Sequence, residues 1–117
     1  MRNTIKKHSD FLASAQDIDA RGEFFVVRAR PAKKEDARYG LVVTKRTFKL
    51  AVDRNRAKRV LRDWIRHNQQ YMHPELDYIF LARHRILTAS RTDGRNAVRR
   101  ALQYIKKRYD EKSGRDA

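Results

Sequence analysis

A dense run of cations between Arg54 and Arg66 is the part of this sequence best suited to chemistry with an anion. Cations recur there at every fourth position: Arg54, Lys58, Arg62 and Arg66. A helix with 100° per residue would gather four polar residues on one outer face, with Arg56 and Lys58 beside them: Asn55, Arg59, Arg62 and Arg66. Guanidinium groups present a planar fork of donors that fits phosphate oxygens, and they also stack on bases. The run therefore predicts a helix face that binds a phosphate-rich polyanion.

The alternative interpretation of a basic helix face is an ordinary solvated surface. Like charges four residues apart destabilise an isolated helix by about 0.2–0.5 kcal/mol per pair. Two or three cations would fit a solvated surface, but this face carries at least five, and Asp63 is the only acidic residue within the run. Because too few acidic residues offset the repulsion among these cations, the face favours a polyanion ligand. For Asn55, a helix-terminus cap and a ligand contact both remain open.

Further cations precede the run. Lys45 and Arg46 are expected to end a strand, and Lys49 lies in the connection to the helix. A helix that begins near Asp53 also presents free backbone N–H groups and a partial positive charge at its first turn. The entry to the helix should therefore add anion-binding groups to those of the arginines.

The whole chain shares this charge. Its 117 residues include 29 Lys and Arg against 14 Asp and Glu, a formal net charge of +15. The length predicts a single domain over 1–117, with 112–117 as a disordered tail.

The chain contains no cysteine, which excludes disulfides and thiolate zinc sites, and no apolar run approaches the roughly 18 residues of a membrane span. A cytoplasmic protein with no membrane partner is expected. Binding to an anionic membrane surface is less favoured, because the core needs the apolar residues.

The elements that position the cations follow from hydrophobic periodicity. Helices are predicted at 9–16, 53–72 and 94–109, and strands at 23–30, 38–46 and 76–82. Asp53 is the expected N-cap of the long helix, and Thr92 or Asp93 that of the last helix. The first two strands should form an antiparallel hairpin, and the apolar run 76–82 should be buried on both faces. The order α-β-β-α-β-α indicates an α+β fold, a two-layer α/β sandwich with a small mixed sheet.

Each of the two longer helices has one apolar stripe. On the long helix the stripe consists of Ala57, Val60, Leu61, Trp64, Ile65, Tyr71 and Met72. On the last helix it consists of Val98, Ala101, Leu102 and Ile105. Because the apolar stripe must face the core, the cationic side of the long helix must face solvent.

Two segments, Gly40–Arg46 and Ala51–Arg62, together resemble the signature of the bacterial ribonuclease P protein family. Its core is Arg54-Asn55-Arg56, then Lys58-Arg59 and Arg62. A lone Arg-Asn-Arg would be weak, but the ordered combination is specific. The resemblance extends over nearly the whole chain, through flanking matches at Asp10-Phe11, a strand at 24–29, Asp77-Tyr78-Ile79 and Ala82-Arg83.

The resemblance implies a protein subunit that binds one catalytic RNA and helps it remove the 5′ leader of precursor tRNA. Catalysis would reside in the RNA and use Mg²⁺ held mainly by the RNA and the substrate, so no catalytic or metal-binding side chain is expected. The implied contacts with the RNA subunit are Arg54, Asn55, Arg56, Lys58, Arg59, Arg62, Arg66 and Lys45. The implied contacts with the single-stranded leader line a central cleft: Phe11, Arg28, Arg30, Val42, Thr44 and Arg46.

Two positions depart from the family pattern. Ala15 stands where many members carry a second aromatic residue, and Arg28 stands where several carry an aromatic residue on the strand. Leader contact should therefore depend more on charge and less on stacking. Phe11 has an alternative role as a core residue that fixes the first helix to the sheet. The family's β-α-β crossover is left-handed, although the general rule gives the right-handed form in about 98% of cases.

Three other protein classes share some of these features. A ribosomal or other structural RNA-binding protein would have the same size, charge and fold class, but the Arg-Asn-Arg signature argues against it. A helix-turn-helix regulator needs two helices joined by a short turn, whereas strands flank the long helix here. An autonomous nuclease needs clustered carboxylates for metal ions, and the acidic residues form no such cluster in the sequence.

Overall fold

The computed structural model describes residues 3–4, 17–32 and 38–112. Two α-helices lie in this part of the chain, α1 (Ala51–His67) and α2 (Arg91–Lys112). The strands are β1 (Asn3–Thr4), β2 (Ile18–Arg21), β3 (Phe25–Pro31), β4 (Arg38–Val42) and β5 (Leu76–Ala82). Two 3-10 turns, η2 (Gln69–Tyr71) and η3 (His84–Thr88), follow α1 and β5. The helix predicted at 9–16 and the tail after Lys112 lie outside the described residues.

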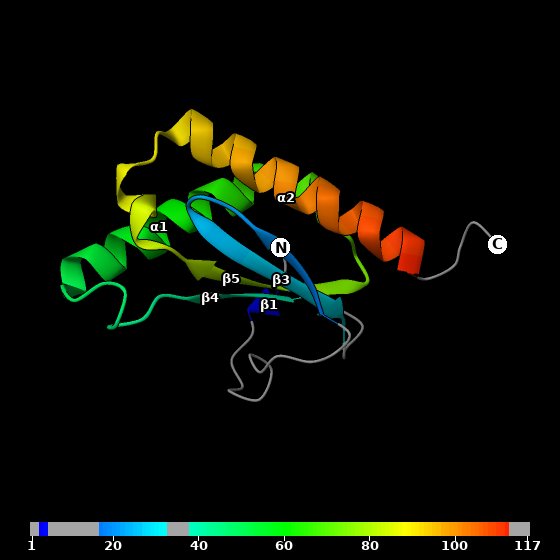
Figure 1. Cartoon of the computed structure of the whole chain (residues 1–117), viewed down its shortest axis with the longest axis horizontal. Helices are drawn as coiled ribbons and strands as arrows, with labels where there is room; N and C mark the ends of the chain where they lie inside the picture. Colours follow the sequence, from blue (N-terminus) through cyan, green and yellow to red (C-terminus); the bar gives the residue numbers. More distant parts are fainter. Residues whose placement is uncertain (1–2, 5–16, 33–37, 113–117) are drawn as a thin grey trace.

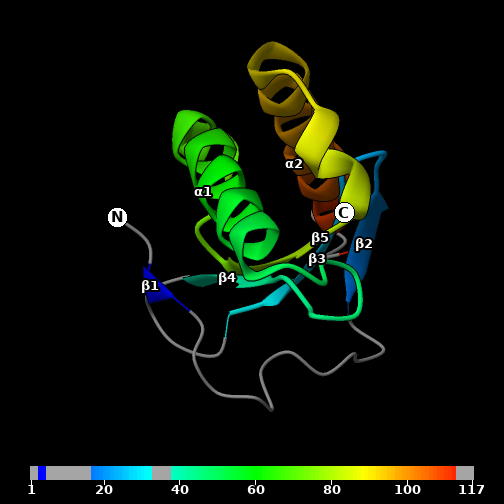
Figure 2. The same cartoon turned by 90° about the vertical axis from the view of Figure 1, so that its left-hand side faces the viewer.

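The strands form one mixed sheet in the order β1-β4-β5-β3-β2. β4 runs parallel to β1 and β5, whereas β3 runs antiparallel to β5 and β2. Both α-helices lie against the same side of the sheet (Figure 1, Figure 2). We call the side that neither α1 nor α2 covers the open face. The arrangement confirms the predicted two-layer α/β sandwich with a small mixed sheet.

The predicted hairpin between the strands at 23–30 and 38–46 is wrong, because β5 lies between β3 and β4. β3 forms its hairpin with β2 instead, and the Gly22 N–H donates to the Phe25 carbonyl at 2.9 Å where the chain turns. The sequence pattern misses β2 because its four residues, IDAR, alternate apolar and charged side chains over a very short run. The short connection between β3 and β4 would favour direct pairing of these two strands, but β5 pairs with both of them instead.

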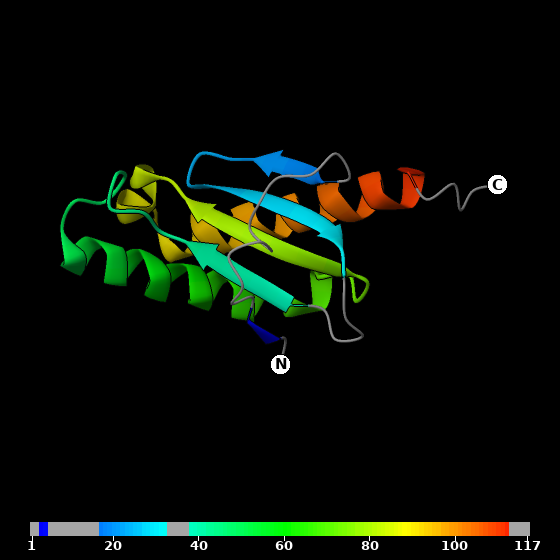
Figure 3. The same ribbon diagram turned by 90° about the horizontal axis from the view of Figure 1, so that it is seen from below.

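The parallel unit β4–α1–β5 is a left-handed crossover. Figure 3 views the sheet from the open face, with α1 behind it. When β4 and β5 are turned to point upward in that view, β5 lies to the right of β4, so from the helix side it lies to the left. This is the rarer hand among parallel crossovers. It agrees with the expectation drawn from the family resemblance.

The core lies between the sheet and the helices. Five residues of the predicted stripe on the long helix are buried: Ala57, Leu61, Trp64 and Ile65 in α1, and Met72 beyond its end. Three of the predicted α2 stripe are buried, namely Val98, Leu102 and Ile105. β5 is buried on both faces as predicted. Gly94 allows α2 to approach α1 closely, since a Cβ atom there would lie 2.0 Å from ring atoms of Trp64. The helix contact therefore requires the absence of a side chain at this position.

The helix ends differ from the predicted caps. α1 begins at Ala51 with Leu50 in the N-cap position, so Asp53 lies within the first turn. α1 ends at His67, not at 72, because the Asn68 side-chain amide donates to the carbonyls of Trp64 and Arg95, each at 2.9 Å. In α2, the Ser90 hydroxyl accepts the Asp93 N–H at 3.0 Å, which moves the cap two or three residues earlier than predicted.

Candidate nucleic-acid interface

The outer face of α1 presents the predicted cations to solvent. Five of its polar side chains are exposed: Asn55, Arg56, Arg59, Arg62 and Arg66. Lys58 is partly exposed on the flank. Within the described residues, no salt bridge joins an acidic side chain to any of the five cations, Arg56, Lys58, Arg59, Arg62 and Arg66. We call this set the α1 basic face. Because its charges are uncompensated, it is suited to a polyanion rather than to intramolecular pairing.

Asp63 does not neutralise the α1 basic face. Its carboxylate accepts hydrogen bonds from Arg95 of α2 at 3.0 and 3.2 Å. The bond from Arg95 is the main reason that the pKa of Asp63 lies below its usual value. The one acid within the cationic run therefore joins α1 to α2.

Arg54 has a structural role at the entry to α1. Its guanidinium donates to the carbonyls of Phe48 and Lys49 at 2.8 and 3.2 Å, and the residue is partly buried. These bonds fix the turn that leads into the helix. The predicted contact of Arg54 with RNA remains a prediction. It would use the guanidinium N–H groups that are not bonded to these carbonyls.

Lys45 and Arg46 do not end a strand as predicted, because β4 stops at Val42 and the two cations lie in a turn. The turn is closed by the Phe48 N–H bond to the Thr44 carbonyl at 2.9 Å. The Thr47 N–H also donates to the Thr44 hydroxyl at 3.2 Å. Lys45 and Arg46 are exposed, so the turn presents them to solvent just before α1.

The open face of the sheet carries Arg28, Arg30 and Val42, three of the residues predicted for the leader. Strand register places Arg28 between Asp19 of β2 and Ile79 of β5. Arg28 Nε lies 3.0 Å from Asp19, and this bond is the largest cause of the raised pKa of Arg28. Arg30 Nε lies 3.1 Å from Asp17, and the Arg30 side chain is nearly buried. Both predicted cations thus already face carboxylates.

A buried ion pair lies at one end of the open face. The Arg38 guanidinium lies 2.9 Å from Asp77, and the Arg38 backbone N–H donates to the same carboxylate at 2.7 Å. Only 7% of the Arg38 side chain and 2% of the Asp77 side chain are exposed. The pair joins the first residue of β4 to β5, next to Arg30, which is opposite Asp77 in the strand register.

Comparison with known proteins decides the family. The chain matches the model of the Ribonuclease P family over residues 1–106, which include the α1 basic face and the open face. The chain belongs to the ribonuclease P protein family. It is 40% identical to the ribonuclease P protein component of Marinomonas sp. (strain MWYL1) over 87 residues, which cover 74% of this chain and 64% of that protein. It is 42% identical to that of Bordetella avium over 98 residues, which cover 81% of each. For the first of these, the match spans less than two thirds of the relative's length.

Solved structures agree with this membership. The RNase P protein of Staphylococcus aureus superposes with a TM-score of 0.73 at 26% identity and covers 91% of this chain and 97% of its own. The RNase P protein of Thermotoga maritima superposes with a TM-score of 0.65 at 22% identity and covers 76% and 84%, which supports the fold alone. The ribonuclease P fold is therefore common to the three chains.

The ribonuclease P assignment leaves some predicted residues without a described position. Phe11 and Ala15 lie outside the described residues, so the predicted aromatic side of the leader cleft stays a prediction. Sequence reasoning missed the acidic partners Asp17 and Asp19, because they belong to the unpredicted strand β2 or lie directly before it. It also missed Arg91, which precedes the predicted start of the last helix at 94, and the role of Arg95, whose bond to Asp63 depends on the packing of α2 beside α1.

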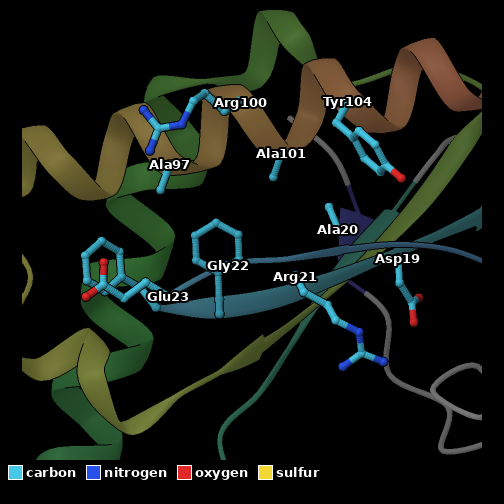
Figure 4. Close-up of a pocket in the computed structure, with 11 residues that line it drawn as sticks. Asp19, Ala20, Arg21, Gly22, Glu23, Ala97, Arg100, Ala101 and Tyr104 are labelled. Atoms are coloured by element: carbon cyan, nitrogen blue, oxygen red, sulfur yellow. The ribbon is translucent and has the colours of Figure 1, made fainter.

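A hollow of about 580 Å³ lies between β2 and α2, on the side of α2 away from α1. Small side chains such as Ala20, Ala97 and Ala101 line it, and Tyr104 extends from α2 toward β2 (Figure 4). Charged residues of both signs, including Glu23 and Arg100, surround it. This mixed charge does not favour an anion, so substitutions on this side of α2 can serve as controls for those on the α1 basic face.

Among residues 3–4, 17–32 and 38–112, no group of three His, Asp or Glu side chains is placed to hold a metal ion. Neither α1 nor α2, the long helices of the described part, combines the length and apolarity needed to cross a membrane.

Proposed function

We propose that this chain is the protein subunit of ribonuclease P, which binds the catalytic RNA and assists removal of the 5′ leader from precursor tRNA. The observation that carries the proposal is the α1 basic face, because its cations are uncompensated and lie within the segment that matches the family. Arg59, Arg62 and Arg66 would contact phosphates of the RNA subunit. Lys45, at the turn before α1, would extend the contact.

The proposal assigns the open face to the single-stranded leader. Val42 at the end of β4, together with Thr44 and Arg46 in the exposed segment that follows it, would provide accessible contacts. Arg28 and Arg30 would act differently from the prediction made from charge alone, because Asp19 and Asp17 hold their guanidinium groups in place. They would offer oriented N–H donors rather than free positive charge. Phe11 remains the proposed stacking residue.

Chemistry in this proposal belongs to the RNA. Mg²⁺ would be held by the RNA subunit and the substrate, as the family resemblance implies. The protein would contribute positive charge that allows the RNA to fold and bind substrate with fewer metal ions. A one-to-one complex with the RNA subunit and a cytoplasmic location are part of the same proposal.

Reconstitution tests the function. Addition of the protein to a bacterial ribonuclease P RNA should lower the Mg²⁺ concentration needed for half-maximal cleavage of precursor tRNA, because protein cations replace part of the metal ions at the RNA. The measurement is the rate of 5′ leader release across a Mg²⁺ titration, with and without protein. If the protein leaves the titration unchanged, the proposed function is wrong.

A further inference from the structure

A second hollow, of about 440 Å³, lies between α1 and the start of α2. Val60, Trp64 and Ala89 give it an apolar lining. Arg59 and Arg66 line it from α1, and Arg91 lines it from α2. We call this feature the α1–α2 groove. It brings guanidinium groups of two helices, distant in sequence, to one concave surface.

The charge in the α1–α2 groove is strongly positive. Asp63 is its one acidic lining residue, and the Asp63 carboxylate is already bonded to Arg95. Arg66 and Arg91 are close enough to Asp63 to act on it electrostatically. Yet within the described residues Arg59, Arg66 and Arg91 form no salt bridge of their own. Three guanidinium groups therefore surround a hollow whose only carboxylate is satisfied.

We propose that the α1–α2 groove binds a phosphate group of the RNA subunit, with Arg91 as the contact that α2 contributes. Arginine forks fit phosphate oxygens, and an apolar lining reduces the screening of their charge by water. This inference rests on the proposed function, and it extends the α1 basic face across to a residue of α2.

Arg91→Ala tests the groove, with Arg100→Ala as the matched control. Both residues are exposed on α2, and both substitutions remove one positive charge, but Arg100 lies beside the hollow on the β2 side. Loss of one phosphate contact should reduce the salt slope of RNA binding by about 0.7–0.9 and the affinity by about 5- to 8-fold near 0.1 M salt. Arg100→Ala should change both values much less. Equal effects of the two variants would overturn the proposal.

A second measurement separates this inference from the proposed function. Inorganic pyrophosphate should raise the melting temperature of the free protein at constant ionic strength, because it binds the native state. The rise should be smaller for Arg91→Ala than for Arg100→Ala. If wild-type protein shows no preference for ribonuclease P RNA over an unrelated RNA of equal length, the proposed function is wrong. The pyrophosphate comparison still tests whether the α1–α2 groove binds phosphate. Identical shifts in melting temperature for the two variants would refute the phosphate site.

Discussion

Replacement of Arg59 and Arg62 together by alanine is expected to weaken binding of ribonuclease P RNA by about 25- to 60-fold near 0.1 M salt. Both side chains are exposed, and neither forms a salt bridge in the described part of the chain, so the loss should come from the complex and not from the fold. Each phosphate contact adds about 0.7–0.9 to the dependence of log affinity on log salt. The double variant should therefore have a slope smaller by about 1.4–1.8.

The control is Arg100→Ala with Lys107→Ala. These residues are exposed and seven positions apart, so they lie on one side of α2, the side away from α1. The control removes the same two charges from a protein of the same fold. Filter binding over a range of salt concentrations gives both affinity and slope. If the control variant loses as much slope as Arg59→Ala/Arg62→Ala, bulk charge and not the α1 basic face binds the RNA.

Asp77→Ala should have the largest effect on stability. The substitution removes a carboxylate that is bonded to the Arg38 guanidinium, and it also removes the acceptor of the Arg38 backbone N–H. Removal of one partner from a buried ion pair costs about 3–5 kcal/mol. For a domain of this size that loss corresponds to a fall of roughly 10–25 °C in melting temperature. Thermal unfolding followed by circular dichroism measures it.

Asp63→Ala is the matched comparison for Asp77→Ala. It also removes a carboxylate that accepts two hydrogen bonds from an arginine, but 38% of the Asp63 side chain is exposed. Water and ions screen such a pair, so the expected loss is below about 1 kcal/mol. The difference between the two variants would show that burial of the pair causes the larger loss of stability. A loss for Asp77→Ala no greater than that for Asp63→Ala would show that the Arg38–Asp77 pair does not anchor β4 to β5.

The α1 basic face could be predicted from the sequence because it depends on local periodicity. Seventeen residues in one helix fix which side chains share a face, and the apolar stripe from Ala57 to Ile65 fixes which face is buried. The predicted arc of Asn55, Arg59, Arg62 and Arg66 is therefore found exposed. The buried strand β5 was equally predictable, because five successive buried residues require an apolar run with little alternation.

The features that could not be predicted depend on pairing between distant segments. The local sequence predicts β3 and β4 as strands, but it contains no signal that β5 lies between them. The carboxylates that face Arg28 and Arg30 come from β2 and the residue before it, so their effect appears only once the register is known. For the same reason, Arg91 joins Arg59 and Arg66 only through the packing of α2 on α1 at Gly94.

The most direct test of the central claim locates the RNA on the protein. The chain contains no cysteine, so a single cysteine can carry an iron–EDTA group that cuts nearby RNA backbone. Asn55→Cys places the group on the α1 basic face, and Tyr104→Cys places it on the opposite side of α2, where the side chain is 48% exposed. In the complex, the group at position 55 should cut ribonuclease P RNA at a few defined sites, and the group at position 104 should cut it weakly or not at all. Stronger cutting from position 104 than from position 55 would contradict the assignment of α1 as the RNA-binding face.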